Sequence, residues 1–521
     1  MAGKAPQLTP FAKILIIAVV IGGGFFGYQF ANKQGWIPKP APKAASATPP
    51  KGLFGGSKSK ALRVCLNTWV GFAPGVYYNG GLKPSSASRF TQDGVEVEFS
   101  INDDFQNILD GWKADQYDVV CNTADVLSTF FPNIVNLEPK VFMQIDWSRG
   151  GDVIVVAPGI NNVQDLKGKR IAVAFGTPSQ TLLLWVLSAG GLKYSDIEVI
   201  KAPTALDAAS YFKAGKVDAA VVWSPDDQDC VKSVAGSKIL RSTKDASNTI
   251  ADIFYVKNSV LLARQDDLKK FAEGWFKAAA EINGSDASRA AAQKLMSTVF
   301  NQPEEVMNLL NARLCTYGDN VQFFNLNGDY NGIKGEDLYE KTATAIPQIS
   351  LVFKESLPDQ SMVPSWRSVS STMILKSILN FTGPEQAAEA AATFTKPTAA
   401  IVKKEAFATK RVTINFETGA YALCDECRYK IDKEFADIAK SFAKCRIRVE
   451  GNTDNTGDYS MNKKLSMNRA KSVVDYLISR WGFDKNRFIV VGNGPDKPVA
   501  SNDTEEGRAQ NRNTAFELIG E

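Results

Sequence analysis

The sequence of 521 residues contains no histidine at all. Without an imidazole the chain cannot form a Ser-His-Asp or Cys-His catalytic arrangement, and it cannot build a metal site with histidine ligands. Chemistry based on carboxylates or lysines remains open. The composition therefore argues against an enzyme, and we predict no catalytic residues, no metal and no cofactor.

Cysteine is also scarce, and the charge is nearly balanced. Seven cysteines are too few for a disulfide scaffold. Cys424 and Cys427 are the one close pair; with no second pair and no histidine they make a poor zinc site, so we expect a local disulfide. Cys65 and Cys121 fall on strand-like segments and are expected to be buried. The net charge is +4 and no basic block is interleaved with aromatic residues, so nothing suggests a nucleic-acid partner and we predict none.

An apolar run from Ile14 to Tyr28 lies near the N-terminus. It reaches the ~20 residues of a membrane-spanning helix when Phe11, Ala12, Gln29 and Phe30 are counted and Lys13 extends its charged end to the membrane surface. A cleaved signal peptide is the alternative, because Lys4 and Lys13 give a basic start, but no small-x-small cleavage motif follows. We predict an uncleaved anchor that holds the protein in the membrane.

Strands and helices alternate after residue 61. Leu62–Leu66, Val95–Phe99 and Tyr117–Cys121 have strand patterns, and Phe105–Ala114 is helix-like. This βαβ order predicts a parallel sheet covered by helices. A second unit repeats the order, with strands at Asp152–Ala157, Lys169–Ala174, Glu198–Ile200 and Val217–Trp223 and helices at Ser179–Ala189 and Ala205–Ala214. Two such lobes in tandem suggest a cleft between them.

Five segments of this region carry a resemblance to a known family. They are Val64–Pro74, Tyr117–Asp125, Asp146–Asp152, Gly168–Val173 and Ala214–Pro225. Together they resemble the periplasmic solute-binding proteins of ABC importers, in the nitrate/taurine/sulfonate-like branch. The resemblance implies a two-lobed domain that binds a small-molecule solute, and it suggests an ABC permease or an envelope complex as partner.

Loops at the carboxyl ends of the strands should line the cleft. Gly176–Gln180 opens a helix after a strand and offers backbone N–H groups and two hydroxyls, which suits an oxoanion. Two aspartates would instead take an ammonium, and core packing is the alternative for both tryptophans. The predicted ligand-binding residues are Trp69, Thr123, Asp125, Ser148, Thr177, Ser179, Trp223 and Asp226.

A pair of opposite charges stands out near the C-terminus. Asp454 follows the strand-like Arg446–Glu450, and Arg469 lies at the edge of the apolar face of the next helix. A guanidinium in that position needs a carboxylate-like partner. The pair could hold a zwitterion. As the alternative, Asp454 is a turn residue and Arg469 forms a surface ion pair.

The motifs around this pair resemble the OmpA-like peptidoglycan-binding domain. They are a strand with Phe at Ile414–Phe416, Gly451–Asp454, Asn462–Ala470 and Gly507–Arg512. Asn452 replaces the family's usual His, and Asn513 stands where a second Arg often follows. The resemblance implies that Asp454 takes the amine of the stem-peptide diaminopimelate and that Arg469 takes its carboxylate. The predicted peptidoglycan-binding residues are Asp454, Arg469, Thr453, Asn462, Arg508 and Arg512.

The predicted fold class is α/β: a two-lobed periplasmic-binding-protein-like domain and a C-terminal α+β OmpA-like domain, with one N-terminal transmembrane helix. The predicted boundaries are 1–35 for the anchor, 36–60 for a Pro/Ala/Ser/Gly-rich linker, 61–385 for the two lobes, 386–408 for a second linker and 409–521 for the OmpA-like domain.

The predicted function is that of a single-pass protein of the bacterial inner membrane, with most of the chain in the periplasm, that binds peptidoglycan and a small solute, such as an oxoanion. The alternative is a structural or assembly protein whose solute-binding-like domain is a protein-interaction module. An ion-driven stator unit is disfavoured, because the anchor has no Asp or Glu to carry protons.

Overall fold

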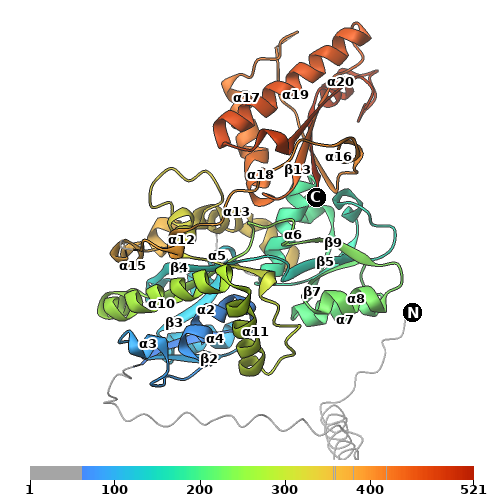
Figure 1. Cartoon of the computed structure of the whole chain (residues 1–521). Helices are drawn as coiled ribbons and strands as arrows, with labels where there is room; N and C mark the ends of the chain where they lie inside the picture. The colour runs from blue at the N-terminus through green and yellow to red at the C-terminus, as the bar shows by residue number, and fades with distance from the viewer. Residues whose placement is uncertain (1–60, 356, 358–359, 379–380, 418, 521) are drawn as a thin grey trace, which may run out of the picture. The chain divides into compact units, whose positions relative to one another are not determined.

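The computed structural model describes residues 61–520 apart from 356, 358–359, 379–380 and 418 (Figure 1). The predicted anchor at 1–35 and the linker at 36–60 lie outside the described residues. Within the described ranges, no helix combines the length and the hydropathy that a membrane span requires.

The first lobe is built on a six-stranded sheet in the order β11-β4-β10-β3-β1-β2 (Figure 1). The strands β1 (Leu62–Leu66), β2 (Val97–Ile101) and β3 (Val119–Thr123) are parallel, as the βαβ pattern predicts. The crossover helix α4 (Phe105–Lys113) begins after Asp104, whose carboxylate accepts hydrogen bonds from the first free backbone N–H groups of the helix.

The other half of this sheet corrects the expectation of a purely parallel arrangement. The strand β10 (Ala251–Lys257) is antiparallel to both β3 and β4 (Pro139–Ser148), and β11 (Ala312–Leu314) is antiparallel to β4. The reason is topological, because β10 belongs to a segment that returns from the second lobe and enters the sheet from the opposite direction.

The second lobe has a five-stranded sheet in the order β7-β6-β8-β5-β9. Its strands are β5 (Asp152–Val156), β6 (Arg170–Ala174), β7 (Glu198–Ala202), β8 (Ala219–Trp223) and β9 (Lys238–Ser242). The strands β6, β7 and β8 are parallel, whereas β5 is antiparallel to β8 and β9. The predicted strands and the predicted helices α6 (Pro178–Ala189) and α7 (Ala205–Lys213) are present with nearly the same bounds.

Further helices cover the two sheets. Their bounds are α2 (Ala73–Asn79), α3 (Arg89–Gln92), α5 (Ala124–Phe130), α8 (Asp226–Ser233), α9 (Asn258–Ala263), α10 (Gln265–Gly284), α11 (Asp286–Phe300), α12 (Tyr317–Phe323), α13 (Gly335–Phe353), α14 (Trp366–Val369) and α15 (Met373–Ser377). Trp275 of α10 fills the core of the first lobe. A Cβ added at Gly75 of α2 would lie 2.1 Å from its ring, so the glycine permits this close packing.

The chain crosses between the lobes twice, at 149–151 and at 243–250. Hydrogen bonds tie the two crossings together. Thr243 Oγ1 lies 2.9 Å from Ser148 Oγ and accepts from Gly150 N at 2.7 Å, and Ser148 N donates to Ile250 O at 3.0 Å. Ser148 therefore sits at the hinge of the two lobes.

The C-terminal domain has a four-stranded sheet in the order β12-β15-β13-β14. The strands are β12 (Ala408–Val412), β13 (Arg446–Asn452), β14 (Phe488–Gly494) and β15 (Thr514–Ile519), and the helices are α17 (Asp425–Ile431), α18 (Asp437–Ser441), α19 (Tyr459–Trp481) and α20 (Glu505–Asn511). Gly451 lets α19 lie directly on β13, because a Cβ there would come within 2.1 Å of Ser466 O. The predicted disulfide joins Cys424 and Cys427 at the start of α17.

The predicted strand at Ile414–Phe416 is wrong. The strand β12 ends at Val412, which pairs with Thr514, the first residue of β15. Beyond that pair no partner strand continues, so Ile414–Phe416 runs as irregular chain.

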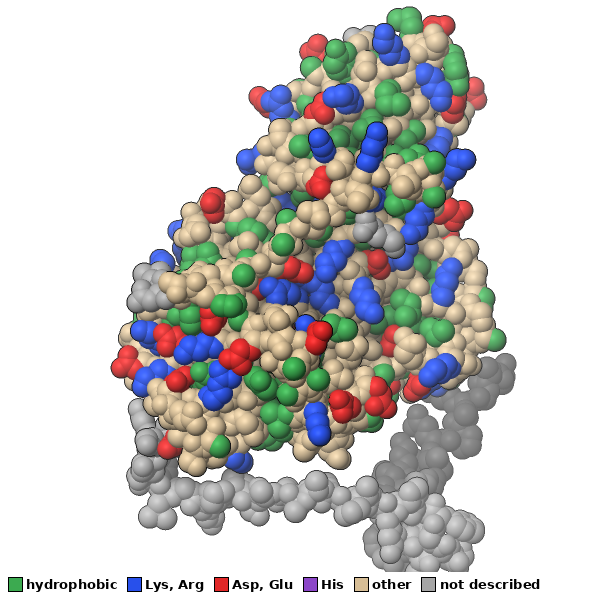
Figure 2. Space-filling view, in the orientation of Figure 1, with side chains coloured by type: hydrophobic (Ala, Val, Ile, Leu, Met, Phe, Trp, Pro, Cys, Tyr) green, Lys and Arg blue, Asp and Glu red, His purple; other side chains and the backbone are tan. Residues whose placement is uncertain are grey.

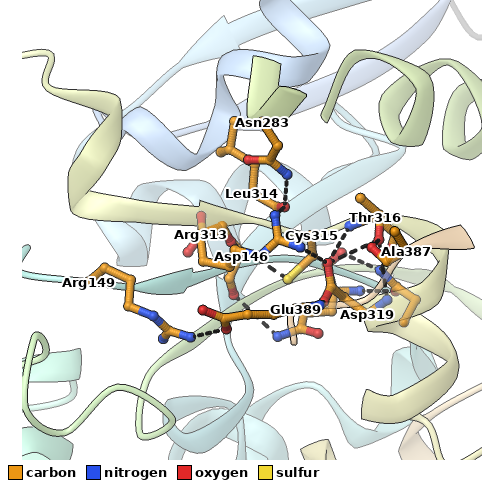
Figure 3. A network of polar contacts seen from close by, with 12 residues as sticks. Asp146, Arg149, Asn283, Arg313, Leu314, Cys315, Thr316, Asp319, Ala387 and Glu389 are labelled. Atoms are coloured by element: carbon orange, nitrogen blue, oxygen red, sulfur yellow. Dashed lines mark hydrogen bonds and ion pairs between the residues drawn. The ribbon is translucent and has the colours of Figure 1, made fainter. Parts of the chain in front are cut away.

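Part of the predicted linker 386–408 is fastened to the first lobe (Figure 3). Glu389 N donates to Asp319 Oδ1 at 2.6 Å, and the Glu389 carboxylate forms an ion pair with Arg149 at 2.6 Å. Thr316 Oγ1 donates to Ala387 O at 2.9 Å. The short helix α16 (Ala399–Lys403) follows. The linker therefore contacts the first of the two lobe crossings.

Candidate functional site

A cavity of about 580 Å³, here called the C-terminal cavity, opens between the β13–α19 loop, α19, α20 and the chain after β12. All six residues predicted to bind peptidoglycan line it: Thr453, Asp454, Asn462, Arg469, Arg508 and Arg512. Acidic and basic side chains are mixed over much of the visible surface of the protein (Figure 2). The C-terminal cavity likewise holds both signs of charge.

Arg469 lines this cavity without forming an ion pair within the described part of the chain. Its Nε donates to Ala420 O at 3.0 Å and its Nη2 to Glu417 O at 3.3 Å. The guanidinium carbon lies 4.8 Å from the centroid of the Phe416 ring. Burial lowers the pKa of Arg469, and the charge of Asp454 acts in the opposite direction. The surface ion pair considered as the alternative is not found among the described residues, and Nη1 has no acceptor there.

Asp454 has two partners. Its Oδ1 accepts from Thr456 N at 2.9 Å, which is the turn contact of the alternative interpretation, and its Oδ2 accepts from Arg512 Nη1 at 2.6 Å. Arg512 also bonds Glu505 at 2.7 Å. Burial raises the pKa of Asp454, but the hydrogen bonds from Arg512 and Thr456 outweigh it and hold the pKa below its usual value. The carboxylate is therefore ionised at neutral pH and can receive a cation.

The two departures from the family pattern contact one another behind this cavity. Asn452 Nδ2 donates to Asn513 Oδ1 at 3.0 Å, and Asn493 Nδ2 donates to Asn452 Oδ1 at 2.9 Å. The same Asn493 amide reaches Glu450 Oε2 at 2.9 Å. All four side chains are buried. The two substituted residues therefore contact each other, and Asn452 lies directly before the β13–α19 loop.

Replacing Asn513 by alanine should destabilise the C-terminal domain by about 1–3 kcal/mol, because the buried Asn452 amide keeps only its longer hydrogen bond, to Glu450 O at 3.4 Å. Urea unfolding of Asn513→Ala, Asn452→Ala and the double variant measures the coupling of the pair. The double variant should be less destabilised than the sum of the single variants. Strict additivity would show that the contact is not formed.

A second cavity, of about 90 Å³ and here called the interlobe cavity, lies between the two lobes. Four predicted ligand-binding residues line it, namely Trp69, Thr123, Ser148 and Trp223. Asp152, Asp252, Phe105 and Pro178 also line it. None of its lining residues is a lysine or an arginine.

Trp69 is held in a fixed position beside this cavity. Its Nε1 donates to Asp146 Oδ2 at 2.9 Å. Two glycines make room for the pair, because a Cβ at Gly71 would lie 1.5 Å from Asp146 Oδ2 and one at Gly151 would lie 2.3 Å from the Trp69 ring. Trp69 is therefore a positioned wall of the cavity, and its contact with a ligand stays a prediction.

The other four predicted ligand-binding residues do not line the interlobe cavity. Asp125 is fully buried and accepts a hydrogen bond from Thr181. Thr177 precedes α6 and donates to Ala174 O at 3.0 Å, and Ser179 is fully buried in the first turn of α6. Asp226 opens α8. From the predicted anion-binding helix start, only Pro178 reaches the cavity.

Sequence reasoning did not assign Asp152 and Asp252 to the ligand site. Ser148 Oγ donates to Asp152 Oδ2 at 3.1 Å, and Asp252 stands opposite Asp146 in the pairing of β10 with β4. Burial raises the pKa of Asp152 to about 7. Burial and the neighbouring charge of Asp146 raise the pKa of Asp252 well above its usual value. The signal for Asp252 was available as a lone acid in the apolar strand Ala251–Lys257.

Comparisons with known protein families agree with this organisation. Residues 415–512 match the OmpA family, and residues 152–283 match the family described as NMT1/THI5 like. The chain therefore carries an OmpA-family domain at its C-terminus, fused to an NMT1/THI5-like domain.

Similarity to individual proteins is confined to parts of the chain. Over 96 residues the chain is 41% identical to outer membrane porin F of Pseudomonas aeruginosa, covering 18% of this chain and 27% of the porin. Over 84 residues it is 45% identical to the peptidoglycan-binding protein ArfA of Mycobacterium tuberculosis, covering 16% of this chain and 26% of ArfA. The chain thus spans about a quarter of the length of these two relatives.

Among solved structures, the periplasmic aliphatic sulphonate-binding protein SsuA from Escherichia coli aligns with a TM-score of 0.44 at 19% identity. The alignment covers 58% of this chain and 91% of SsuA.

Proposed function

We propose that this protein binds peptidoglycan through the C-terminal cavity and a small solute in the interlobe cavity. One observation carries the proposal of peptidoglycan binding. Arg469 lines the same cavity as Asp454 and has no carboxylate partner in the described chain. A diaminopimelate residue presents an ammonium and a carboxylate on one carbon. Asp454 would receive its ammonium and Arg469 its carboxylate, each through a charge-assisted hydrogen bond.

The other lining residues complete the proposed site. Thr453, Asn462 and Arg508 offer neutral and basic donors around the pair. Arg512 holds Asp454 in place through their ion pair. The OmpA-family match and the printed name of ArfA, a peptidoglycan-binding protein, support the same ligand.

The test is co-sedimentation of the full-length protein, solubilised in detergent, with purified peptidoglycan. Diaminopimelate-type peptidoglycan should carry the protein into the pellet. Lysine-type peptidoglycan is the matched comparison, because lysine lacks the second carboxylate that Arg469 would bind. Equal pelleting with both types would contradict the proposed role of Arg469.

For the solute-binding part, the NMT1/THI5-like match and the cavity between two hinged lobes support a small-molecule ligand. Such lobes close on a ligand by rotation about their crossings. The predicted oxoanion has weaker support, because Thr177 and Ser179 do not line the cavity and no basic residue does. An ABC permease or an envelope complex would be the partner of a working solute-binding unit.

The cellular location is proposed from the sequence of the N-terminal segment and from the envelope proteins among the relatives. Residues 1–35 would anchor the chain in the bacterial inner membrane, and residues 36–60 would tether the lobes and the 409–521 domain in the periplasm. Peptidoglycan binding requires that side of the membrane. We propose no enzymatic activity.

The proposed membrane anchor can be tested by washing the membrane fraction with sodium carbonate. Expressed in a bacterial host, the full-length protein should stay in the membrane fraction after sodium carbonate washing, because a spanning helix is not held by surface charge. Deletion of residues 1–35 should release it, provided that a cleavable signal replaces them for export. An intact protein found in the carbonate supernatant would refute the anchor.

A further inference from the structure

The interlobe cavity is acidic, and this identifies the class of its ligand if the proposed solute-binding function holds. Asp152 and Asp252 line the cavity, Asp146 lies directly behind Trp69, and no lysine or arginine lines it. Asp146 and Asp152 are buried, with 0% and 6% of their surface exposed, and Asp252 is partly buried. A buried anion ligand would face these groups without a counter-charge, whereas a cation would supply the charge that they lack.

Three polar atoms at the cavity lack a hydrogen-bond partner in the described chain. They are Asp152 Oδ1, Thr123 Oγ1 and Trp223 Nε1. Thr123 is 3% exposed and lines the cavity, so its buried hydroxyl is available for a hydrogen bond to a ligand there. Thr123 lies near enough to Asp125, and Trp223 near enough to Asp152, to lower the pKa of that carboxyl group. Neither Thr123 nor Trp223 makes a hydrogen bond of good geometry. Buried polar groups without partners are rare, so a ligand is the natural occupant of this space.

The chemistry of the three atoms specifies the ligand further. Asp152 Oδ1 is an acceptor and needs a donor, whereas the Trp223 indole N–H is a donor and needs an acceptor. Trp69, Trp223 and Phe105 form aromatic walls that suit an organic cation. No group of three or more carboxylate and cysteine side chains is arranged to hold a metal ion among the described residues. The volume of about 90 Å³ equals roughly three water molecules.

We propose that the interlobe cavity binds a small primary ammonium compound that carries a second, oxygen-bearing group. Asp152 and Asp252 receive the ammonium, Thr123 adds a hydroxyl, and the Trp223 indole donates to the oxygen of the ligand. An amino alcohol of the size of ethanolamine fits both the donor pattern and the volume.

Isothermal titration of the full-length protein in detergent tests this proposal with defined probes. Ethanolamine should bind, and ethylene glycol, which replaces its ammonium by a hydroxyl, should not. Sulfate, nitrate and methanesulfonate form the anion arm. Asp152→Asn and Asp252→Asn should each weaken ethanolamine binding by about tenfold or more, because each removes one charge-assisted contact. Asp229→Asn, on the exposed side of α8 outside the cavity, is the matched control and should bind like the unaltered protein.

The outcomes distinguish a wrong ligand class from the absence of solute binding. Binding of an anion but not of ethanolamine overturns the ammonium ligand and leaves the solute-binding function standing. Ethanolamine binding that survives both Asp→Asn changes overturns the assignment to this cavity. If no probe of either class binds, the ammonium proposal fails together with solute binding, and the protein-interaction module becomes the better interpretation of the two lobes. Circular dichroism of both variants confirms that they are folded, and the comparison of ethanolamine with ethylene glycol needs no variant.

Discussion

Replacing Arg469 by alanine should abolish the pelleting of the full-length protein with diaminopimelate-type peptidoglycan. The Arg469 guanidinium would pair with the ligand carboxylate, and such a bond contributes about 1.5–3 kcal/mol, or roughly a 10- to 150-fold change in affinity. Replacing Asp454 by asparagine should have an effect of similar size, because the ligand ammonium would lose its counter-charge. Pelleting assays at protein concentrations near the dissociation constant would show both losses.

Controls for this experiment lie on the same helix. Lys471 and Asp475 form an exposed ion pair on α19 and do not line the C-terminal cavity. Lys471→Ala and Asp475→Asn remove the same charges as the two test variants and should pellet normally. The circular dichroism of all four variants should match that of the unaltered protein. If Arg469→Ala and Asp454→Asn pellet like the controls, the proposed peptidoglycan site is in the wrong place.

The stability of the two lobes should fall as the pH rises from about 5 to 7, and Asp152→Asn should remove part of this dependence. Burial raises the pKa of Asp152 to about 7, compared with about 3.9 in an unfolded chain. At a pH between these two pKa values, Asp152 is protonated in the folded state and ionised in the unfolded state. Each unit of pH then costs about 1.4 kcal/mol, and the full cost at and above pH 7 is on the order of 4 kcal/mol.

Several neighbouring groups shift the pKa of Asp152 and thereby set how strongly the stability of the lobes depends on pH. Ser148 and Trp223 favour its ionised form, whereas the charges of Asp125 and Asp146 oppose it. Burial raises the pKa of Asp125 to about 6, and it also raises the pKa values of Asp146 and Asp252. Because these carboxyl groups interact, their contributions will not be additive.

Urea unfolding followed by tryptophan fluorescence, at steps between pH 5 and pH 8, measures this dependence. The stability of Asp152→Asn relative to the unaltered protein should increase by about 2–3 kcal/mol between pH 5 and pH 7 and then level off. Asp229→Asn should follow the unaltered protein throughout. A stability that rises with pH in this range would contradict the raised pKa.

The sequence by itself determined the local elements and pointed to one candidate pair of binding residues. Strands such as β1, β6 and β8 follow from short apolar runs, and α19 follows from an apolar stripe at helical spacing, because both patterns are local properties of the chain. Asp454 and Arg469 could be found because short motifs hold them at a set distance along a strand, a loop and a helix. Both line one cavity in the structure.

Only the tertiary structure decided which distant residues meet. Asp252 reaches the interlobe cavity because β10 returns from the second lobe and pairs with β4, a connection that no local pattern records. Asn452 and Asn513 read as two separate departures from a motif, yet they form one hydrogen-bonded pair across β13 and β15. The acidic character of the interlobe cavity has the same origin. Asp152 of β5 and Asp252 of β10 line it, Asp146 of β4 stands opposite Asp252, and the surroundings that raise their pKa values exist only when the sheets are assembled.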